Sequence, residues 1–249
     1  MKPVKWGASH TEEKNLVKIT DDGAFFITER GEQFLGPKES IDIQHKLGAD
    51  IILAFDECTS PLHDHEYTKK SLDRTHKWAK ICLKEHNRHG HSHGHGHGHS
   101  RQLLYGIVQG GEWRDLREKS AKFIGNLLFD GFAIGGSLGK SRADMLRILE
   151  WTIMLLPEEK PRHLLGMGKI EDIFDGVERG IDTFDCVIPT REARHGAIWS
   201  AHGRFDIIKS KNAATLELLD ETCLCQTCAK WRIRKKDLYE LFKSKNPEA

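Results

Sequence analysis

The sequence lacks any long run of apolar residues. No stretch approaches the roughly 20 residues that an α-helix needs to span a bilayer. The first ten residues, MKPVKWGASH, contain no apolar segment of the kind found in signal peptides. These absences argue against a membrane protein and against secretion, so we expect a cytoplasmic protein with no membrane partner.

The sequence also lacks a strong excess of either charge. Its 38 Lys and Arg residues nearly balance 37 Asp and Glu residues, which gives a formal net charge of +1. This balance argues against a polybasic nucleic-acid binder and against an acidic tail. Any contact with a nucleic acid must therefore come from a local basic patch.

Cysteine is scarce and unevenly distributed. Of the six cysteines, Cys58, Cys82 and Cys186 lie apart in apolar segments, whereas the other three crowd into residues 223–228. Disulfides are rare in a reducing compartment. The crowding therefore indicates a metal site.

Strand-like and helix-like segments alternate along the chain. Short apolar runs predict buried parallel strands over 50–56, 103–109, 131–135, 163–167 and 183–188, with a hairpin strand before them over 24–28. Helices are predicted over 66–86, 113–128, 141–155 and 170–179. Because these segments alternate at the length of βαβ units, we expect an α/β fold.

No Gly-x-Gly-x-x-Gly motif follows the first predicted strand. This absence favours a (β/α)8 barrel of the TIM type over an open doubly wound sheet. Only five strands are legible after residue 50, whereas a closed barrel has eight, so we expect an incomplete barrel. Barrel chemistry sits at the carboxyl ends of the strands. There the sequence places Asp56, Glu57, Gln109, Gly135, Gly136, Met167 and Asp185.

Five strand-end motifs and one cysteine motif stand in a characteristic order. They are Ala-Phe-Asp-Glu-Cys-Thr at 54–59, Gly-Ile-Val-Gln-Gly-Gly at 106–111, Gly-Phe-Ala-Ile-Gly-Gly at 131–136, Leu-Gly-Met-Gly at 165–168, Phe-Asp-Cys-Val-Ile-Pro-Thr-Arg at 184–191 and Cys-x-Cys-x-x-Cys at 223–228. In order and spacing they resemble the tRNA-guanine transglycosylase family, the queuine and archaeosine tRNA-ribosyltransferases. The resemblance covers the chain from about residue 16 to about residue 241. It implies a pentosyltransferase of queuosine biosynthesis.

The resemblance implies a reaction and its partners. Family members exchange guanine at the wobble position of a tRNA with a GUN anticodon for a 7-deazaguanine, and they usually form homodimers. The aspartate that matches Asp185 attacks the ribose anomeric carbon and forms a covalent intermediate, as carboxylates do in retaining glycosidases. Taken alone, Asp185 would be better explained by a salt bridge or a helix cap, and the surrounding motifs favour the nucleophile.

The resemblance also implies a base pocket. Asp56, Gln109 and the backbone of Gly136 are expected to read the purine edge, because glycine lets a ligand approach the main chain closely. Cys58 is expected to line this pocket. Met167 either forms one face of a stacking slot or fills the core.

Basic residues after the expected nucleophile are candidates for tRNA binding. Arg191, Arg194 and His195 are predicted in a loop. Guanidinium groups suit phosphate, so we expect contacts to the tRNA backbone. Ordinary surface charge is the alternative explanation.

Cys223, Cys225 and Cys228 have a spacing suited to one tetrahedral Zn²⁺ ion. The family's fourth ligand is a histidine about one helix further on, and no such histidine is present. We therefore expect an incomplete zinc site in a segment over 201–249, after a partial barrel over 1–200. Water or another group is the alternative fourth ligand.

A second set of potential metal ligands lies in a low-complexity segment rich in histidine and glycine. It comprises His89, His91, His93, His95, His97 and His99. Imidazole suits nickel, copper and zinc. We expect a flexible loop over 87–100 with incidental metal affinity, and a metal-storage protein is the remote alternative.

Two departures from the family pattern bear on activity. Residues 1–26 contain no match to the family's Asp-Ser-Gly-Gly-Phe-Gln motif, whose aspartate is assigned to proton transfer or base binding. After Gly136 the chain reads Ser-Leu-Gly-Lys, one residue shorter than is usual in bacteria. The incoming base is thus 7-aminomethyl-7-deazaguanine or another 7-deazaguanine. The alternative to an enzyme is a non-catalytic tRNA-binding or partner subunit of the same family.

Overall fold

The computed structural model describes residues 17–90 and 102–244. The chain divides into two compact units, residues 1–185 and residues 186–249. The expected division at residue 200 falls instead inside a hairpin of the second unit, which spans 197–206. Each unit is described separately below.

The first unit contains two sheets and five helices within the described residues. Its strands are β1 (Val17–Ile19), β2 (Ala24–Thr28), β3 (Gly31–Leu35), β4 (Ile51–Leu53), β5 (Leu103–Val108), β6 (Gly131–Ile134), β7 (Arg162–Leu164) and β8 (Thr183–Phe184). Its helices are α1 (Pro37–Leu47), α2 (His65–Gly90), α3 (Arg114–Gly125), α4 (Arg142–Ile153) and α5 (Ile170–Glu178). The first three strands form an antiparallel sheet that includes the predicted hairpin strand.

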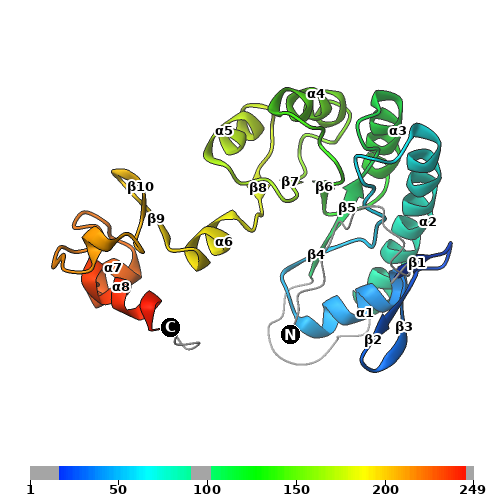
Figure 1. The fold of residues 1–249 in the computed structure, drawn as a ribbon. Helices are drawn as coiled ribbons and strands as arrows, with labels where there is room; N and C mark the ends of the chain where they lie inside the picture. The colour runs from blue at the N-terminus through cyan, green and yellow to red at the C-terminus, as the bar shows by residue number, and fades with distance from the viewer. Residues whose placement is uncertain (1–16, 91–101, 245–249) are drawn as a thin grey trace. The chain divides into compact units, whose positions relative to one another are not determined.

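The second sheet is parallel and follows the order β4-β5-β6-β7-β8. Because spatial order equals chain order, the crossover helices have no switch point at which to change sides. Figure 1 shows α2, α3 and α4 on the same side of this sheet. All five carboxyl ends therefore meet at one edge, as in a barrel. The expected α/β class is confirmed.

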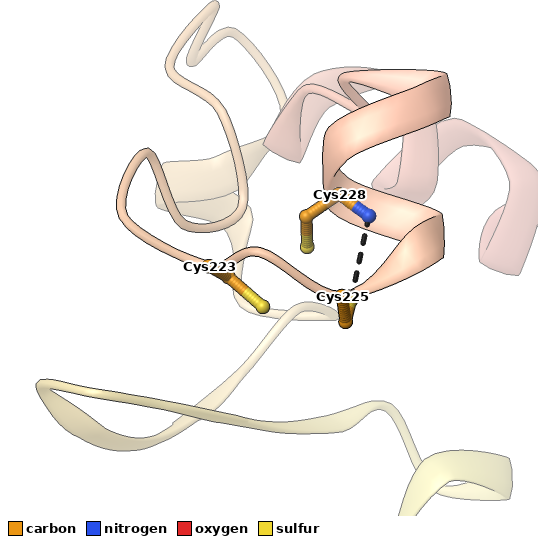
Figure 2. A group of neighbouring side chains, drawn as sticks. All are labelled: Cys223, Cys225 and Cys228. Atoms are coloured by element: carbon orange, nitrogen blue, oxygen red, sulfur yellow. Dashed lines mark hydrogen bonds between the residues drawn. The ribbon is translucent and has the colours of Figure 1, made fainter.

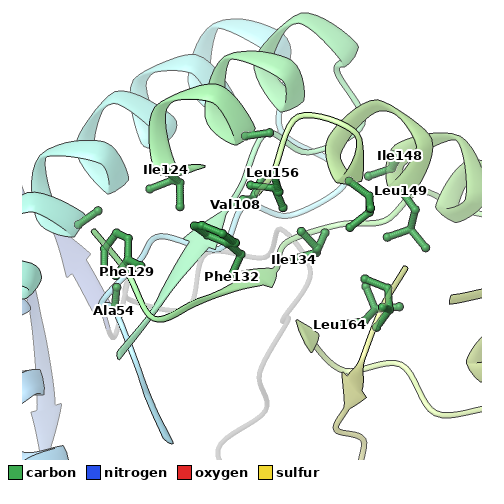
Figure 3. Packing of buried hydrophobic residues seen from close by; sticks show 14 of the residues in the cluster. Ala54, Val108, Ile124, Phe129, Phe132, Ile134, Ile148, Leu149, Leu156 and Leu164 are labelled. Carbon is green, nitrogen blue, oxygen red and sulfur yellow. The ribbon is translucent and has the colours of Figure 1, made fainter. Parts of the chain in front are cut away.

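The core lies between the parallel sheet and its helices. All four residues of β6 are buried, and Phe132 and Ile134 pack with Ile124 of α3 and Ile148 of α4 in one apolar cluster (Figure 3). A strand buried on both faces is typical of parallel sheets. This packing fixes the strand ends on which the candidate site is built.

Helix boundaries follow local capping chemistry. Asp64 begins α2 by accepting the N–H of Tyr67 at 2.8 Å. Ser141 and Asp144 form a capping box at the start of α4. No helix within the described residues combines the length and the apolar character needed to cross a membrane.

Several expected boundaries differ from the structure, and in two cases the kind of element is wrong. Residues 87–90 continue α2 instead of forming a loop, because an established helix adds each further residue at low cost. The remainder of the predicted loop, 91–100, lies outside the described residues. The predicted strand over 183–188 ends after Phe184, and Ile188 begins a helix with proline in its first turn.

The second unit is smaller. It comprises α6 (Ile188–Arg194), β9 (Ala197–Ser200), β10 (Gly203–Asp206), the 3₁₀ turn η1 (Ser210–Asn212), α7 (Gln226–Trp231) and α8 (Lys235–Lys243). Strands β9 and β10 form an antiparallel hairpin. Buried Asn212 donates from Nδ2 to the carbonyls of Asp206 and Ile207, at 2.9 and 3.1 Å. These bonds hold the segment after the hairpin in place.

Gly106 of β5 generates a stability prediction. A Cβ at this position would come within 2.5 Å of Cδ2 of Phe129 and 2.8 Å of Cγ2 of Ile124. Both side chains are fully buried, so Gly106→Ala is expected to lower the free energy of unfolding by about 1–3 kcal/mol. Chemical denaturation of single and double variants measures this. In a Phe129→Leu background the same substitution should cost less, and an equal cost would contradict the packing described.

Candidate functional site

Asp56 and Gln109 form a hydrogen-bonded pair at the edge where the parallel strands end. Asp56 follows β4 and Gln109 directly follows β5. Gln109 is buried, and its Nε2 donates to Oδ2 of Asp56 at 2.5 Å. The parallel pairing of β4 with β5 brings these residues together across 53 positions of sequence.

Asp56 is held in an unfavourable state for a carboxylate. Burial, with a smaller contribution from the charge of Glu57, raises the pKa of Asp56 from 3.8 to about 6, against the opposing effect of the hydrogen bond from Gln109. A carboxylate removed from water favours a ligand that donates hydrogen bonds to it. Asp56 therefore suits an amide or amine on a bound molecule.

Gly136 brings main chain close to the Gln109 side chain. A Cβ at Gly136 would collide with Oε1 of Gln109, and the residue has a φ of +79°. This Oε1 is buried and has no hydrogen-bond partner within the described residues. A buried acceptor without a partner is costly, so the pocket fits a ligand that carries a donor.

Glu57 is anchored, in contrast to Asp56. Its carboxylate pairs with Arg74 and accepts the hydroxyl of Tyr67 at 2.9 Å. Its own N–H donates to Oγ1 of Thr75 at 3.1 Å. These bonds to α2 fix the segment that carries Asp56, so Glu57 supports the site structurally.

Cys58 is exposed two residues after Asp56. Partial desolvation of the thiol by neighbouring groups raises its pKa, with a further increase from the negative charge of Asp56. The thiol is therefore protonated at neutral pH and is a poor nucleophile. Its position beside Asp56 and the N–H of Gly136 suits a pocket-lining role.

Asp185 directly follows β8, with 58% of its side chain exposed. Its Oδ1 lies 3.1 Å from Nε2 of His163 and accepts the N–H of Gly166 at 3.0 Å. Nδ1 of the same histidine lies 2.9 Å from Oγ1 of Thr183. Within the described residues no hydrogen bond reaches Oδ2, so one oxygen is held and the other is accessible.

Sequence reasoning missed the role of His163. His163 on β7 is paired with Thr183 on β8. Thr183 lies two residues before Asp185 in the sequence. Only the strand pairing brings these residues together. A polar residue in an otherwise apolar predicted strand was the one available signal.

Met167 lies half-buried and packs against the apolar core. This contact fits the core-filling explanation of the residue. It follows Gly166, whose N–H holds Asp185, so the packing of Met167 also anchors the loop at the end of β7.

The three candidate tRNA-binding residues lie in the second unit. Arg191 and Arg194 are exposed on α6, and His195 ends this helix. The prediction of a loop is therefore wrong, because Pro189 presets the first turn of a helix. Arg191 and Arg194 are three residues apart and face the same side of α6. Within the described residues neither guanidinium forms an ion pair, so both are available to an anion.

Cys223, Cys225 and Cys228 form the one group of three or more metal-binding side chains within the described residues. Their sulfur atoms all lie within 4.8 Å of one another (Figure 2). Zn–S bonds of about 2.3 Å in a tetrahedron separate sulfurs by about 3.8 Å, so the three thiols fit one zinc ion. Cys225 caps α7, and the N–H of Cys228, 3.4 Å from its Sγ, lowers the Cys225 pKa. That bond favours the thiolate, which is the form that binds metal.

The raised pKa of Asp56 generates a prediction about stability. At a pH between 3.8, the ordinary pKa of an aspartate, and about 6, Asp56 is protonated in the folded protein but ionised in the unfolded chain. Stability from this group is therefore lost as pH rises through that window. Asp56→Asn should raise the free energy of unfolding relative to wild type above about pH 6, and the gain should vanish below about pH 4. Urea denaturation across this range measures it, and parallel pH profiles for both proteins would contradict the assignment.

The cysteine cluster generates a prediction about metal content. Purified chain dialysed against a weak chelator should retain one zinc ion, and Cys225→Ser should lose it because a thiolate ligand is removed. Elemental analysis measures zinc per chain. Cys186→Ser, outside the cluster but in the same unit, should retain the metal. Zinc content unaffected by Cys225→Ser would instead place the metal on other side chains.

Comparisons with known proteins identify the family of this chain. The family model described as queuine tRNA-ribosyltransferase matches residues 7–249. A protein of Archaeoglobus fulgidus that bears this name provisionally is 47% identical over 93% of the chain. The queuine tRNA-ribosyltransferases of Shouchella clausii and Bacillus subtilis are 46% and 45% identical over 86% and 84% of the chain.

The coverage of these relatives is partial. The chain spans 58%, 55% and 53% of the lengths of the three proteins. The match nevertheless extends over nearly all of this sequence, and it includes every strand end described above. The chain belongs to the queuine tRNA-ribosyltransferase family.

Proposed function

We propose that this chain carries the catalytic centre of a tRNA-guanine transglycosylase, which exchanges guanine at the wobble position of a GUN-anticodon tRNA for a 7-deazaguanine. The observation that carries the proposal is the Asp185 carboxylate, oriented by two hydrogen bonds at the sheet edge that also bears Asp56 and Gln109. The names of the relatives support the same reaction class. A hydrogen-bonded polar pair suited to a purine edge and an accessible carboxylate are the two parts that this reaction needs.

Asp185 is the proposed nucleophile. In the first step its carboxylate oxygen bonds to C1′ of the ribose, the C1′–N9 bond breaks, and the electron pair leaves with guanine, which takes up a proton. In the second step the incoming base loses a proton and its N9 bonds to C1′ as the bond between C1′ and the Asp185 oxygen breaks, and the electron pair of that bond restores the carboxylate. A carboxylate is a suitable partner for an oxocarbenium-like centre.

The two oxygens of Asp185 have different roles in this proposal. Oδ1 is held by His163 and by the N–H of Gly166. Oδ2 is the attacking atom. A carboxylate that is already oriented by hydrogen bonds loses little conformational entropy when it attacks. This lowers the entropic part of the activation free energy.

The base pocket is proposed to comprise Asp56, Gln109, Gly136, Cys58 and Met167. Asp56 accepts from the ring amide and exocyclic amine of the purine, and Gln109 and the Gly136 main chain read the neighbouring edge. A site built from buried polar groups rejects ligands that leave those groups unpaired. Base binding should consequently weaken as pH falls through about 6 and Asp56 gains a proton.

Further parts of the proposal concern the rest of the chain. We propose that the five-stranded sheet corresponds to strands of a (β/α)8 barrel and that Cys223, Cys225 and Cys228 hold a structural zinc ion. This ion would fix the segment before α7 to the helix without taking part in the reaction. Arg191, Arg194 and His195 are proposed to contact tRNA phosphates, and a homodimer is the proposed assembly.

Trapping of the covalent intermediate tests the proposed function. Wild-type chain incubated with tRNA and a deazaguanine analogue should give an adduct that survives denaturing electrophoresis. Asp185→Asn should give none, because an amide is a far weaker nucleophile than a carboxylate. Asp50→Asn, at the opposite end of β4, should behave as wild type.

Two outcomes would contradict the assignment. An Asp185→Asn protein that forms as much adduct as wild type would exclude this residue as nucleophile. If wild type and Asp185→Asn both bind tRNA but neither forms an adduct, a non-catalytic tRNA-binding subunit becomes the better description.

A further inference from the structure

Arg117 of α3 lies behind the strand ends that carry Gln109 and Gly136. Its side chain is completely buried, with 0% of its surface exposed. Within the described residues no carboxylate forms an ion pair with it, and its hydrogen bonds all go to main-chain carbonyls. A buried charge without a counterion is costly, and charge-assisted hydrogen bonds offset that cost.

The first two bonds bracket Gln109. Nη1 of Arg117 donates to the carbonyl of Val108 at 3.1 Å, and Nε donates to the carbonyl of Gly111 at 2.7 Å. The Gln109 N–H itself donates to Oγ of Ser120 at 3.2 Å, one helical turn further along α3. The main chain on both sides of Gln109 is therefore attached to one face of this helix.

The other two bonds bracket Gly136. Nη1 also donates to the carbonyl of Gly135 at 2.9 Å, and Nη2 donates to the carbonyl of Ser137 at 2.8 Å. A single planar group thus joins the loop after β5 to the loop after β6. These are the two loops whose relative position decides how the Gln109 amide meets the Gly136 main chain.

The guanidinium keeps its charge in this setting. Burial lowers the pKa of Arg117 to about 10, which is still well above neutral pH. Its five N–H donors lie in one rigid plane, whereas the lysine ammonium is a compact group on a flexible stem. Lysine therefore keeps the charge but loses the fixed geometry.

We propose that Arg117 is a positioning residue that determines base specificity, by holding the two loops that present Gln109 and Gly136 in one fixed register. It acts through these residues and touches no substrate. This inference rests on the proposed function, since it takes the pocket between these loops to bind a purine.

Direct binding of two bases to the full chain tests the inference. Guanine carries the exocyclic amine from which Asp56 would accept a hydrogen bond, and hypoxanthine lacks this amine. Isothermal titration should show that wild type prefers guanine, and in Arg117→Lys the ratio of the two dissociation constants should fall about tenfold or more toward unity. Arg114→Lys is the matched control. Arg114 is exposed on the same helix and, among the residues that the structure describes, its side chain bonds only to Glu118, so its replacement should leave the ratio unchanged.

The ratio separates positioning from stability. A variant that is merely less stable has a smaller binding-competent fraction, which weakens both bases equally and leaves the ratio constant. If Arg117→Lys is not folded at the assay temperature, Arg117→Gln, which keeps a planar group with two donors, is measured in its place and should also show a reduced ratio.

The outcomes also separate this inference from the proposed function. Wild type that binds guanine, together with a variant that keeps the wild-type ratio, would overturn the role of Arg117 and leave the proposed function standing. Wild type that binds neither base would contradict the purine pocket itself, and the inference with it.

Discussion

The parallel pairing of β4 to β8 in chain order is the constraint on which the site depends. It brings together at one edge residues that lie far apart in sequence, from Asp56 to Asp185. Helices α2, α3 and α4 lie on one side of this sheet, and the central strand β6 is buried along its whole length. The carboxyl ends are therefore positioned by the core, and the chemistry depends on side chains that extend beyond it.

Several polar groups at this edge are buried or lack a hydrogen-bond partner, which costs stability. Neighbouring helices hold each of them in place. Asp56 is a carboxylate with a raised pKa, Gln109 has a buried acceptor without a partner in the described residues, and Arg117 is a buried cation. Such groups reduce stability unless a ligand or a framework satisfies them. The framework here comes from the neighbouring helices, and the ligand is expected to satisfy the remainder. Active sites typically combine polar groups that the protein satisfies itself with polar groups that only a ligand satisfies.

The sequence predicted the parts of the fold that depend on local pattern. The run at 131–135 corresponds to β6, because a strand buried on both faces is continuously apolar. It failed where pairing or a boundary decides the structure. The link between His163 and Asp185 requires the β7–β8 register, which no local pattern encodes. Residues 189–194, which belong to α6, were predicted as a loop because seven residues are too few to show a helical period.

The location of the covalent bond to tRNA tests the central claim most directly. After the trapped adduct is digested with nuclease and trypsin, fragment-ion mass spectrometry of the peptide over 180–191 identifies the modified side chain. The proposed mechanism predicts a ribose phosphate without its base, joined through C1′ to Asp185, and an unmodified Asp182 in the same peptide. A ribose attached to any other residue would contradict it.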